Sequence, residues 1–228
     1  MKKILLVVLC LISSSMFAQN DVTKFMGIPV DGFKSDMIQK LKGKGFVSSA
    51  NDKDVLEGEF NGVDVYVCPV TNNNKVYRIM LCDIHKMDRT SIKIRFNNLC
   101  HQFKKNSNYV SVDDYTIADN EDIGYEISVH DKRYEALFYQ KAVIDSIEIA
   151  NRIRNEYAIR KYTQQELDNP TEDIKKDLED AYLDLERLYK KYGTLKKIVW
   201  FMIAEYMGKY YITMYYDNEY NKANGEDL

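Results

Sequence analysis

The sequence predicts an α+β fold, in which strands form an antiparallel sheet and helices pack on one face of it. Asn61-Gly62 lies between two runs of alternating apolar and polar residues, which is the strongest short-range signal for a two-residue β-hairpin. A second hairpin pattern turns at Met207-Gly208, and between the two patterns the apolar residues of 91–105 recur at helical spacing. Hairpins that are segregated from helices along the chain are typical of α+β proteins.

Residues 1–18 have the layout of a secretory signal peptide. Lys2 and Lys3 precede a short apolar run, and a stretch of small residues ends at Ala18, where we expect cleavage. The apolar run is too short to span a membrane. Cys10 follows Leu9 and lies inside the run, which disfavours a lipoprotein. We therefore expect an exported chain, periplasmic or extracellular, that starts near Gln19.

Charge and composition exclude several classes of protein. The chain has 32 Lys and Arg against 35 Asp and Glu, and Lys2 and Lys3 would leave with the signal peptide. Such an acidic balance argues against a nucleic-acid partner. No later stretch is long and apolar enough for a transmembrane segment in the mature chain. With 45% hydrophobic residues and three prolines, the chain can bury a core, and its length fits one large domain or two small ones.

The first part of the mature chain reads as one helix followed by a meander of strands. A short helix is expected from Ser35, which can cap it, to Gly43 or Gly45. The Asn61-Gly62 hairpin follows, with one apolar face and one polar face, as in a half-exposed antiparallel sheet. A third strand is expected over 75–84 after a turn at 71–74.

The second part repeats this order. The helix over 91–105 precedes expected strands at about 109–117, 123–129 and 133–140, the last two joined by a turn at His130-Asp131. The order suggests two diverged helix-plus-meander units, at about 25–84 and 88–141. We divide the mature chain into residues 19–106 and 107–228.

A helical insertion is expected at about 143–193, before the closing hairpin. Apolar residues at helical spacing predict one helix over 143–160. Asn169-Pro170-Thr171 has the features of a helix start, and the apolar stripe that follows it continues to Gly193. Within this insertion, Asp145-Ser146-Ile147 matches a short acceptor pattern for O-glycosylation, which makes Ser146 a candidate modification site.

The closing hairpin carries the candidate binding residues Trp200, Tyr211 and Tyr215. The turn at Met207-Gly208 places Trp200 opposite Tyr215 on one face, whereas Val199 and Phe201 begin the core face. An exposed aromatic face would suit a protein or a glycan, because Trp and Tyr dominate interface hot spots. We nevertheless expect a helix over 172–192 to cover this face with Tyr182, Leu185 and Tyr189, because monomers seldom leave large apolar patches open.

Four stretches of the chain resemble a group of uncharacterised secreted proteins of Gram-negative gut bacteria: GIPVDGFKSDMIQKLKGKGF, LEGEFNGVDVYV, KVYRIML and VWFMIAEYMGKYYITMYYDNEYNKANGEDL. The helix-plus-meander unit is also similar to the fold repeated in β-lactamase inhibitor proteins and in small outer-membrane assembly lipoproteins. The second resemblance implies a binding or scaffold role by analogy, and neither one supplies catalytic residues.

Motifs for catalysis or for a cofactor are lacking. Cys68, Cys82, His85, Cys100 and His101 lie close in the sequence, but without the spacing of a zinc site. The acids of 119–122 do not form a calcium loop, and no nucleophile motif is present. We therefore expect no metal, no cofactor and no assigned catalytic residue.

The cysteines predict a protein without an obligatory disulfide. Three remain in the mature chain, and the expected turn at 71–74 places Cys68 opposite Tyr77 or Arg78. That position lies about four residues from Cys82, at ~3.3 Å per residue, which is beyond bridging distance.

Two functions remain open from the sequence. The first is a non-catalytic binding or scaffold protein of the periplasm or the extracellular space. The alternative is an envelope hydrolase that uses carboxylates, which would require a cleft that gathers two acids about 5–10 Å apart.

Overall fold

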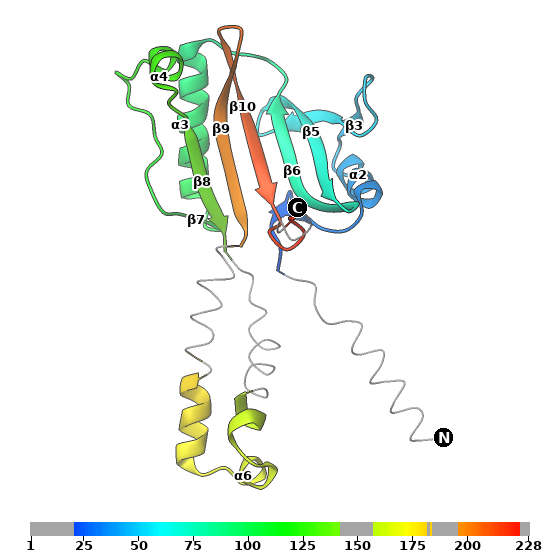
Figure 1. The fold of residues 1–228 in the computed structure, drawn as a ribbon, viewed down its shortest axis with the longest axis vertical. Helices are drawn as coiled ribbons and strands as arrows, with labels where there is room; N and C mark the ends of the chain where they lie inside the picture. The colour runs from blue at the N-terminus through cyan, green and yellow to red at the C-terminus, as the bar shows by residue number, and fades with distance from the viewer. Residues whose placement is uncertain (1–20, 142–156, 182, 184–195, 224–228) are drawn as a thin grey trace.

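The computed structural model has one eight-stranded antiparallel sheet with helices packed against it (Figure 1). The structure describes residues 21–141, 157–181, 183 and 196–223. The predicted α+β fold is confirmed, as is the antiparallel sheet. The signal peptide predicted at 1–18 lies outside the described residues. Within them, no helix is long and apolar enough to cross a membrane.

The sheet order brings the two halves of the chain together at its centre. The strands follow one another across the sheet as β3 (Val47–Ser48), β4 (Leu56–Phe60), β5 (Val63–Asn72), β6 (Lys75–Asp83), β10 (Lys209–Asp217), β9 (Ile198–Tyr206), β8 (Glu135–Gln140) and β7 (Tyr109–Ser111). The last strand of each half, β6 and β10, therefore pair with each other in the middle.

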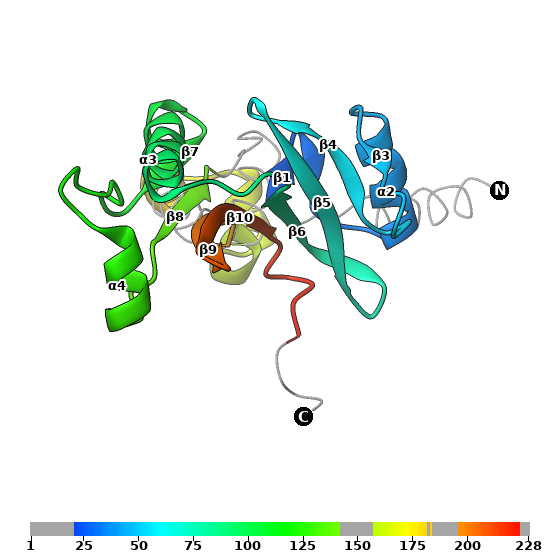
Figure 2. The ribbon, with the colours of Figure 1, turned by 90° about the horizontal axis from the view of Figure 1, so that it is seen from above.

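Each half consists of one helix followed by four strands. Helix α2 (Lys34–Lys42) precedes β3 to β6, and helix α3 (Arg89–Lys105) precedes β7 to β10. Figure 2 shows both helices on the same side of the curved sheet. We expected two helix-plus-meander units at about 25–84 and 88–141. In the structure the second set of four strands includes the closing hairpin and runs to β10, with helix α4 (Ile123–His130) between β7 and β8 and the insertion between β8 and β9.

Three two-residue turns fix the hairpins. The β4–β5 turn has positive φ at Asn61 and Gly62, and Phe60 pairs with Val63 as predicted. The β5–β6 turn uses Asn73-Asn74, and the β9–β10 turn uses Met207-Gly208, again with positive φ at both positions. Positive φ at both central residues matches the right-handed twist of the flanking strands, which is why such turns favour Asn and Gly.

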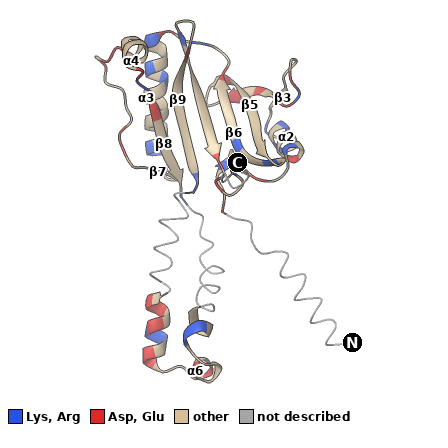
Figure 3. Cartoon of the chain, in the orientation of Figure 1, with Lys and Arg blue, Asp and Glu red and all other residues tan. Residues whose placement is uncertain are grey.

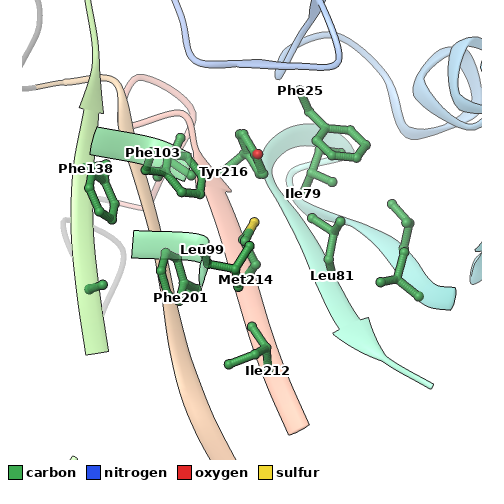
Figure 4. Packing of buried hydrophobic residues seen from close by; sticks show 14 of the residues in the cluster. Phe25, Ile79, Leu81, Leu99, Phe103, Phe138, Phe201, Ile212, Met214 and Tyr216 are labelled. Carbon is green, nitrogen blue, oxygen red and sulfur yellow. The ribbon is translucent and has the colours of Figure 1, made fainter. Parts of the chain in front are cut away.

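The core lies between the sheet and the helices α2 and α3. Figure 4 shows Phe201 of β9 close to Phe103 of α3 and Phe138 of β8, and the Phe201 ring stacks on both. The predicted stripe of α3 is buried, and Asp88 caps this helix by accepting a hydrogen bond from the Ser91 amide. The predicted core face of the closing hairpin is also buried, namely Val199, Phe201, Ile203, Ile212, Met214 and Tyr216.

Several local predictions are wrong. The strand expected over 123–129 is helix α4 (Ile123–His130), because the Asp122 carboxylate accepts from the amides of Gly124 and Tyr125 and Asp131 ends the helix in the left-handed region. Short apolar runs do not distinguish strand from helix by periodicity alone. Ser35 does not cap α2, since Phe33 holds the cap position without a side-chain hydrogen bond. A small hairpin of β1 (Lys24–Phe25) and β2 (Ile28–Pro29) was not predicted.

The helical insertion is described in part. Residues 172–181 are helical after Thr171, as predicted, and α6 (Gln164–Asp168) begins with a capping box formed by Thr163 and Glu166. Figure 1 draws these helices beyond one end of the sheet. Figure 3 shows that acidic side chains are frequent on them. Most of the helix expected over 143–160, and Ser146 within it, lie outside the described residues.

Candidate functional site

The structure places the candidate residues Trp200, Tyr211 and Tyr215 on the face of the sheet opposite to α3. Side chains alternate along β9 and β10, so that Phe201 is fully buried whereas Trp200 next to it is half-buried. Tyr211 and Tyr215 are half-buried as well. The register sets Trp200 opposite Tyr215 and Tyr211 opposite Ala204, as the hairpin pattern predicted. We call this surface, formed by the half-buried side chains of β6, β9 and β10, the open face.

The centre of the open face is a stack of two aromatic rings and a guanidinium group. The rings of Trp200 and Tyr215 lie 4.1 Å apart between centroids, at an interplanar angle of 21°. The guanidinium carbon of Arg78 lies 4.8 Å from the Tyr215 ring and 5.5 Å from the Trp200 ring, within the range of cation–π contacts. Three strands, β6, β9 and β10, therefore contribute to one rigid aromatic surface.

Asp217, the last residue of β10, orients two side chains of the stack through hydrogen bonds. Its carboxylate accepts from Arg78 Nε at 2.5 Å and Nη2 at 2.7 Å, and from Trp200 Nε1 at 3.1 Å. Asp217 is only 4% exposed, so this bidentate pair is shielded from solvent. The hydrogen bond that Arg78 donates to Asp217 raises the pKa of Arg78 above its usual value, and the guanidinium stays charged. Thr23 further anchors the position by donating to the Asp217 carbonyl at 2.5 Å.

Tyr211 lies farther along the open face, toward the β9–β10 turn. It shares this part of the face with Thr213 and with Cys82, which pairs with Thr213 across the strands. Burial raises the pKa of the Tyr211 hydroxyl, and the nearby Cys82 adds to this effect. The tyrosine therefore offers a neutral hydroxyl and a ring edge at neutral pH.

Within the described residues, no helix covers this face. Trp200, Tyr211 and Tyr215 are half-buried, whereas the residues of the opposite face are buried. The described part of the expected helix, 172–181, lies beyond the end of the sheet in Figure 1. The other residues expected to form the cover, namely Tyr182, Leu185 and Tyr189, lie outside the described residues.

The described part of that helix contacts residues 157–162. Leu178 is buried, and the neighbouring Asp177 carboxylate accepts hydrogen bonds from the hydroxyls of Tyr157 and Tyr162. The helix therefore packs against residues 157–162 of its own insertion. A sequence pattern shows that an apolar stripe needs a partner, but it does not identify which partner the chain provides.

A second feature is a surface hollow with acidic residues near the β4–β5 turn. Its volume is about 350 Å³, and it is lined by Glu59, Gly62, Val63, Asp64, Asp83, His85 and Met87. Asp83 forms a bidentate pair with Arg95, which donates to both of its carboxylate oxygens at 2.7 and 2.6 Å. Asp64 lies 3.4 Å from His85, and both side chains are largely exposed. Among the described residues, no cluster of His, Cys, Asp or Glu could hold a metal ion.

The cysteines lie on different parts of the sheet. Cys68 pairs with Met80, two residues from Cys82 and not four as predicted, because the turn is only Asn73-Asn74 and a bulge at Val70/Thr71 shifts the β5–β6 register by one further position. Such diagonal neighbours are roughly 7–8 Å apart, which exceeds the Cβ separation of a disulfide. Cys100 is buried on α3, against the opposite face of the sheet, and all three thiols are free.

We expect no mass change on reduction of the purified protein.

Burial raises the pKa of Cys82 to about 11 and that of Cys100 to about 12, from an ordinary value of 9.0. Folding therefore favours the protonated thiols. This contribution to stability is complete below pH 9 and is lost as the pH rises through 11 to 12. A thiol reagent at pH 8 should label the folded protein far more slowly than the unfolded protein, whereas equal labelling rates would contradict the burial.

Arg78 and Asp217 are the site residues that sequence reasoning missed. Arg78 is a single charge in the apolar run of β6, and Asp217 directly follows the aromatic run of β10. In the sequence, both residues stand out as charged positions in or beside apolar runs. Their contact depends on the pairing of β6 with β10, which are separated by more than half of the chain, and no local pattern encodes that pairing.

Comparison with known proteins gives no match, since no protein family model, no curated protein and no solved structure is similar to this chain. The resemblances stated from the sequence therefore stay predictions, and the case for function depends on the geometry of the open face.

Proposed function

We propose that the chain is an exported, non-catalytic binding or scaffold protein, periplasmic or extracellular, which holds a protein or glycan partner on the open face. The observation that carries the proposal is the stack of Trp200, Tyr215 and Arg78 on a sheet face that stays half-exposed. Large aromatic side chains and arginine are the residue types that contribute most to binding energy in interfaces. The signal-peptide pattern of residues 1–18 supports export.

Preorganisation supports a binding role for these side chains. Asp217 holds Arg78 in a bidentate pair and also accepts from the Trp200 indole, so that the side chains of the stack are already ordered before a partner arrives. Ordering a side chain on binding costs about 0.5–1.5 kcal/mol for each one that is immobilised. A stack that is fixed in advance avoids much of this cost.

The hollow near the β4–β5 turn favours a second candidate, an envelope hydrolase that uses carboxylates. Glu59 and Asp64 both line it, and they are the acids there that could serve as an acid and a base. Asp83 is unsuited to this role, because Arg95 and the Ile212 amide already occupy its carboxylate. Any hydrolytic activity at this hollow should disappear in E59Q and D64N and should persist in W200A.

The binding proposal is tested by comparing a tyrosine of the open face with an exposed tyrosine outside it. The mature protein, immobilised, is exposed to envelope extract and to a panel of soluble oligosaccharides, alongside the variants Y215A and Y125A. Tyr125 is an exposed tyrosine of α4 and serves as a matched control. We expect Y215A to lose at least tenfold in affinity, as for a hot spot of about 1.4 kcal/mol or more, and Y125A to bind like wild type. Equal binding by the two variants would place the site elsewhere.

A further inference from the structure

The connection between β8 and β9 differs from its counterpart in the first unit. In the first unit the second and third strands, β4 and β5, are joined by the two-residue turn Asn61-Gly62. In the second unit the corresponding strands are β8 and β9, and residues 141–197 lie between the last residue of one and the first residue of the other. The next hairpins in the two units, β5–β6 and β9–β10, both use two-residue turns.

The two ends of this long connection are held side by side on the sheet. The Gln140 amide donates to the Lys197 carbonyl at 2.9 Å, which continues the β8–β9 register by one pair. Lys197 is 1% exposed, and its Nζ donates to the Lys141 carbonyl at 3.0 Å and to Asp21 Oδ1 at 2.9 Å. The chain therefore leaves the sheet and returns to it at positions that a tight turn could join.

The described residues of the connection contact one another. Besides Tyr157 and Tyr162, Lys161 donates to Asp177, at 2.7 Å, so that Asp177 ties 157–162 to the helix over 172–181. None of the hydrogen bonds or ion pairs between described residues joins 157–181 to the sheet.

We infer that residues 141–196 are an insertion into the second of two equivalent helix-and-strand units, and that the sheet and its open face are complete without them. The core of the sheet supports this inference. The buried cluster that unites α2, α3 and the sheet contains no residue of the described part of the insertion. A role for the insertion would then be additional to the role of the open face.

The test replaces residues 141–196 with Asn-Gly, so that Gln140 and Lys197 flank the new turn as Phe60 and Val63 flank Asn61-Gly62. A backbone carbonyl remains at position 141 for Lys197. We expect a cooperative melt at a Tm equal to or above that of the full chain, because a shorter connection costs less closure entropy. Acrylamide quenching of Trp200, the single tryptophan, should be unchanged if the open face is complete without the insertion. Neither readout requires a partner.

Two further variants keep the test decisive. One replaces the same residues with a flexible Gly-Ser linker, in case the tight turn itself is strained. The other is a matched control in which residues 112–130, most of the connection between β7 and β8, are replaced with the same linker. Ile117 and Ile123 of that connection belong to the buried core, so the control should lose its cooperative melt. Loss of cooperative melting in both insertion variants, or a marked rise in Trp200 quenching in a folded one, would overturn the inference.

Discussion

Replacing Arg95 with methionine should lower the free energy of unfolding by about 3–5 kcal/mol, because it leaves the buried carboxylate of Asp83 without its counter-charge. Asp83 is 5% exposed, and Arg95 donates to both of its oxygens. The same carboxylate accepts from the Ile212 amide at 3.1 Å. This one acid therefore links α3, β6 and β10. A loss of this size is a large share of the ~5–15 kcal/mol that stabilises a typical domain.

Denaturant unfolding of R95M beside K34M measures this effect. Lys34 pairs with Asp54 at 2.5 Å, but on the surface, where an ion pair contributes roughly 0–1 kcal/mol. The double variant D83N/R95M should recover part of the loss, because it removes the buried charge together with its partner. A loss in R95M no larger than that in K34M would show that Asp83 does not depend on Arg95.

Truncating Phe201 to alanine should cost about 3–5 kcal/mol, whereas truncating its neighbour Trp200 should cost about 1–2 kcal/mol. Phe201 is fully buried, and its ring stacks on Phe103 and Phe138. Trp200 is half-buried, and what it loses is the stack on Tyr215 and the hydrogen bond to Asp217.

The two variants compare adjacent positions of one strand on opposite faces of the sheet. Thermal or denaturant unfolding separates them, since W200A should melt between wild type and F201A. Partner binding should show the reverse order if both variants fold, with W200A the more impaired. Equal losses of stability would mean that both faces of the sheet are covered, as we expected from the sequence.

Local signals in the sequence predict much of the sheet. Asn61-Gly62 and Met207-Gly208 determine hairpins whose registers the structure confirms, because a two-residue turn leaves one possible pairing for the flanking strands. The stripe of α3 is equally local, since side chains three and four residues apart share a helix face. The alternation of side chains along β9 and β10 likewise places the candidate residues Trp200, Tyr211 and Tyr215 on one face of the sheet.

The other features of the fold and of the site depend on strand pairing between distant parts of the chain or on polar groups that cap helices, and local patterns do not predict these. Asp122 converts an apolar run into α4 through two backbone hydrogen bonds, and its role is visible only once those bonds are known. The Arg78–Asp217 pair exists because β6 and β10 meet at the centre of the sheet. The helix over 172–181 is tied to residues 157–162 by hydrogen bonds from Tyr157 and Tyr162 to Asp177, which the apolar stripe does not predict.

Acrylamide quenching of the single tryptophan tests the open face most directly. The reference is W200F/F201W, whose only indole lies on the buried face of the same strand, and the unfolded protein gives the upper limit. We predict that Trp200 in the wild-type protein is quenched several-fold more than the indole of this reference and less than in the unfolded protein, as its partial exposure requires. Quenching as weak as that of the buried reference would contradict the account, because an indole that solvent cannot reach cannot meet a partner.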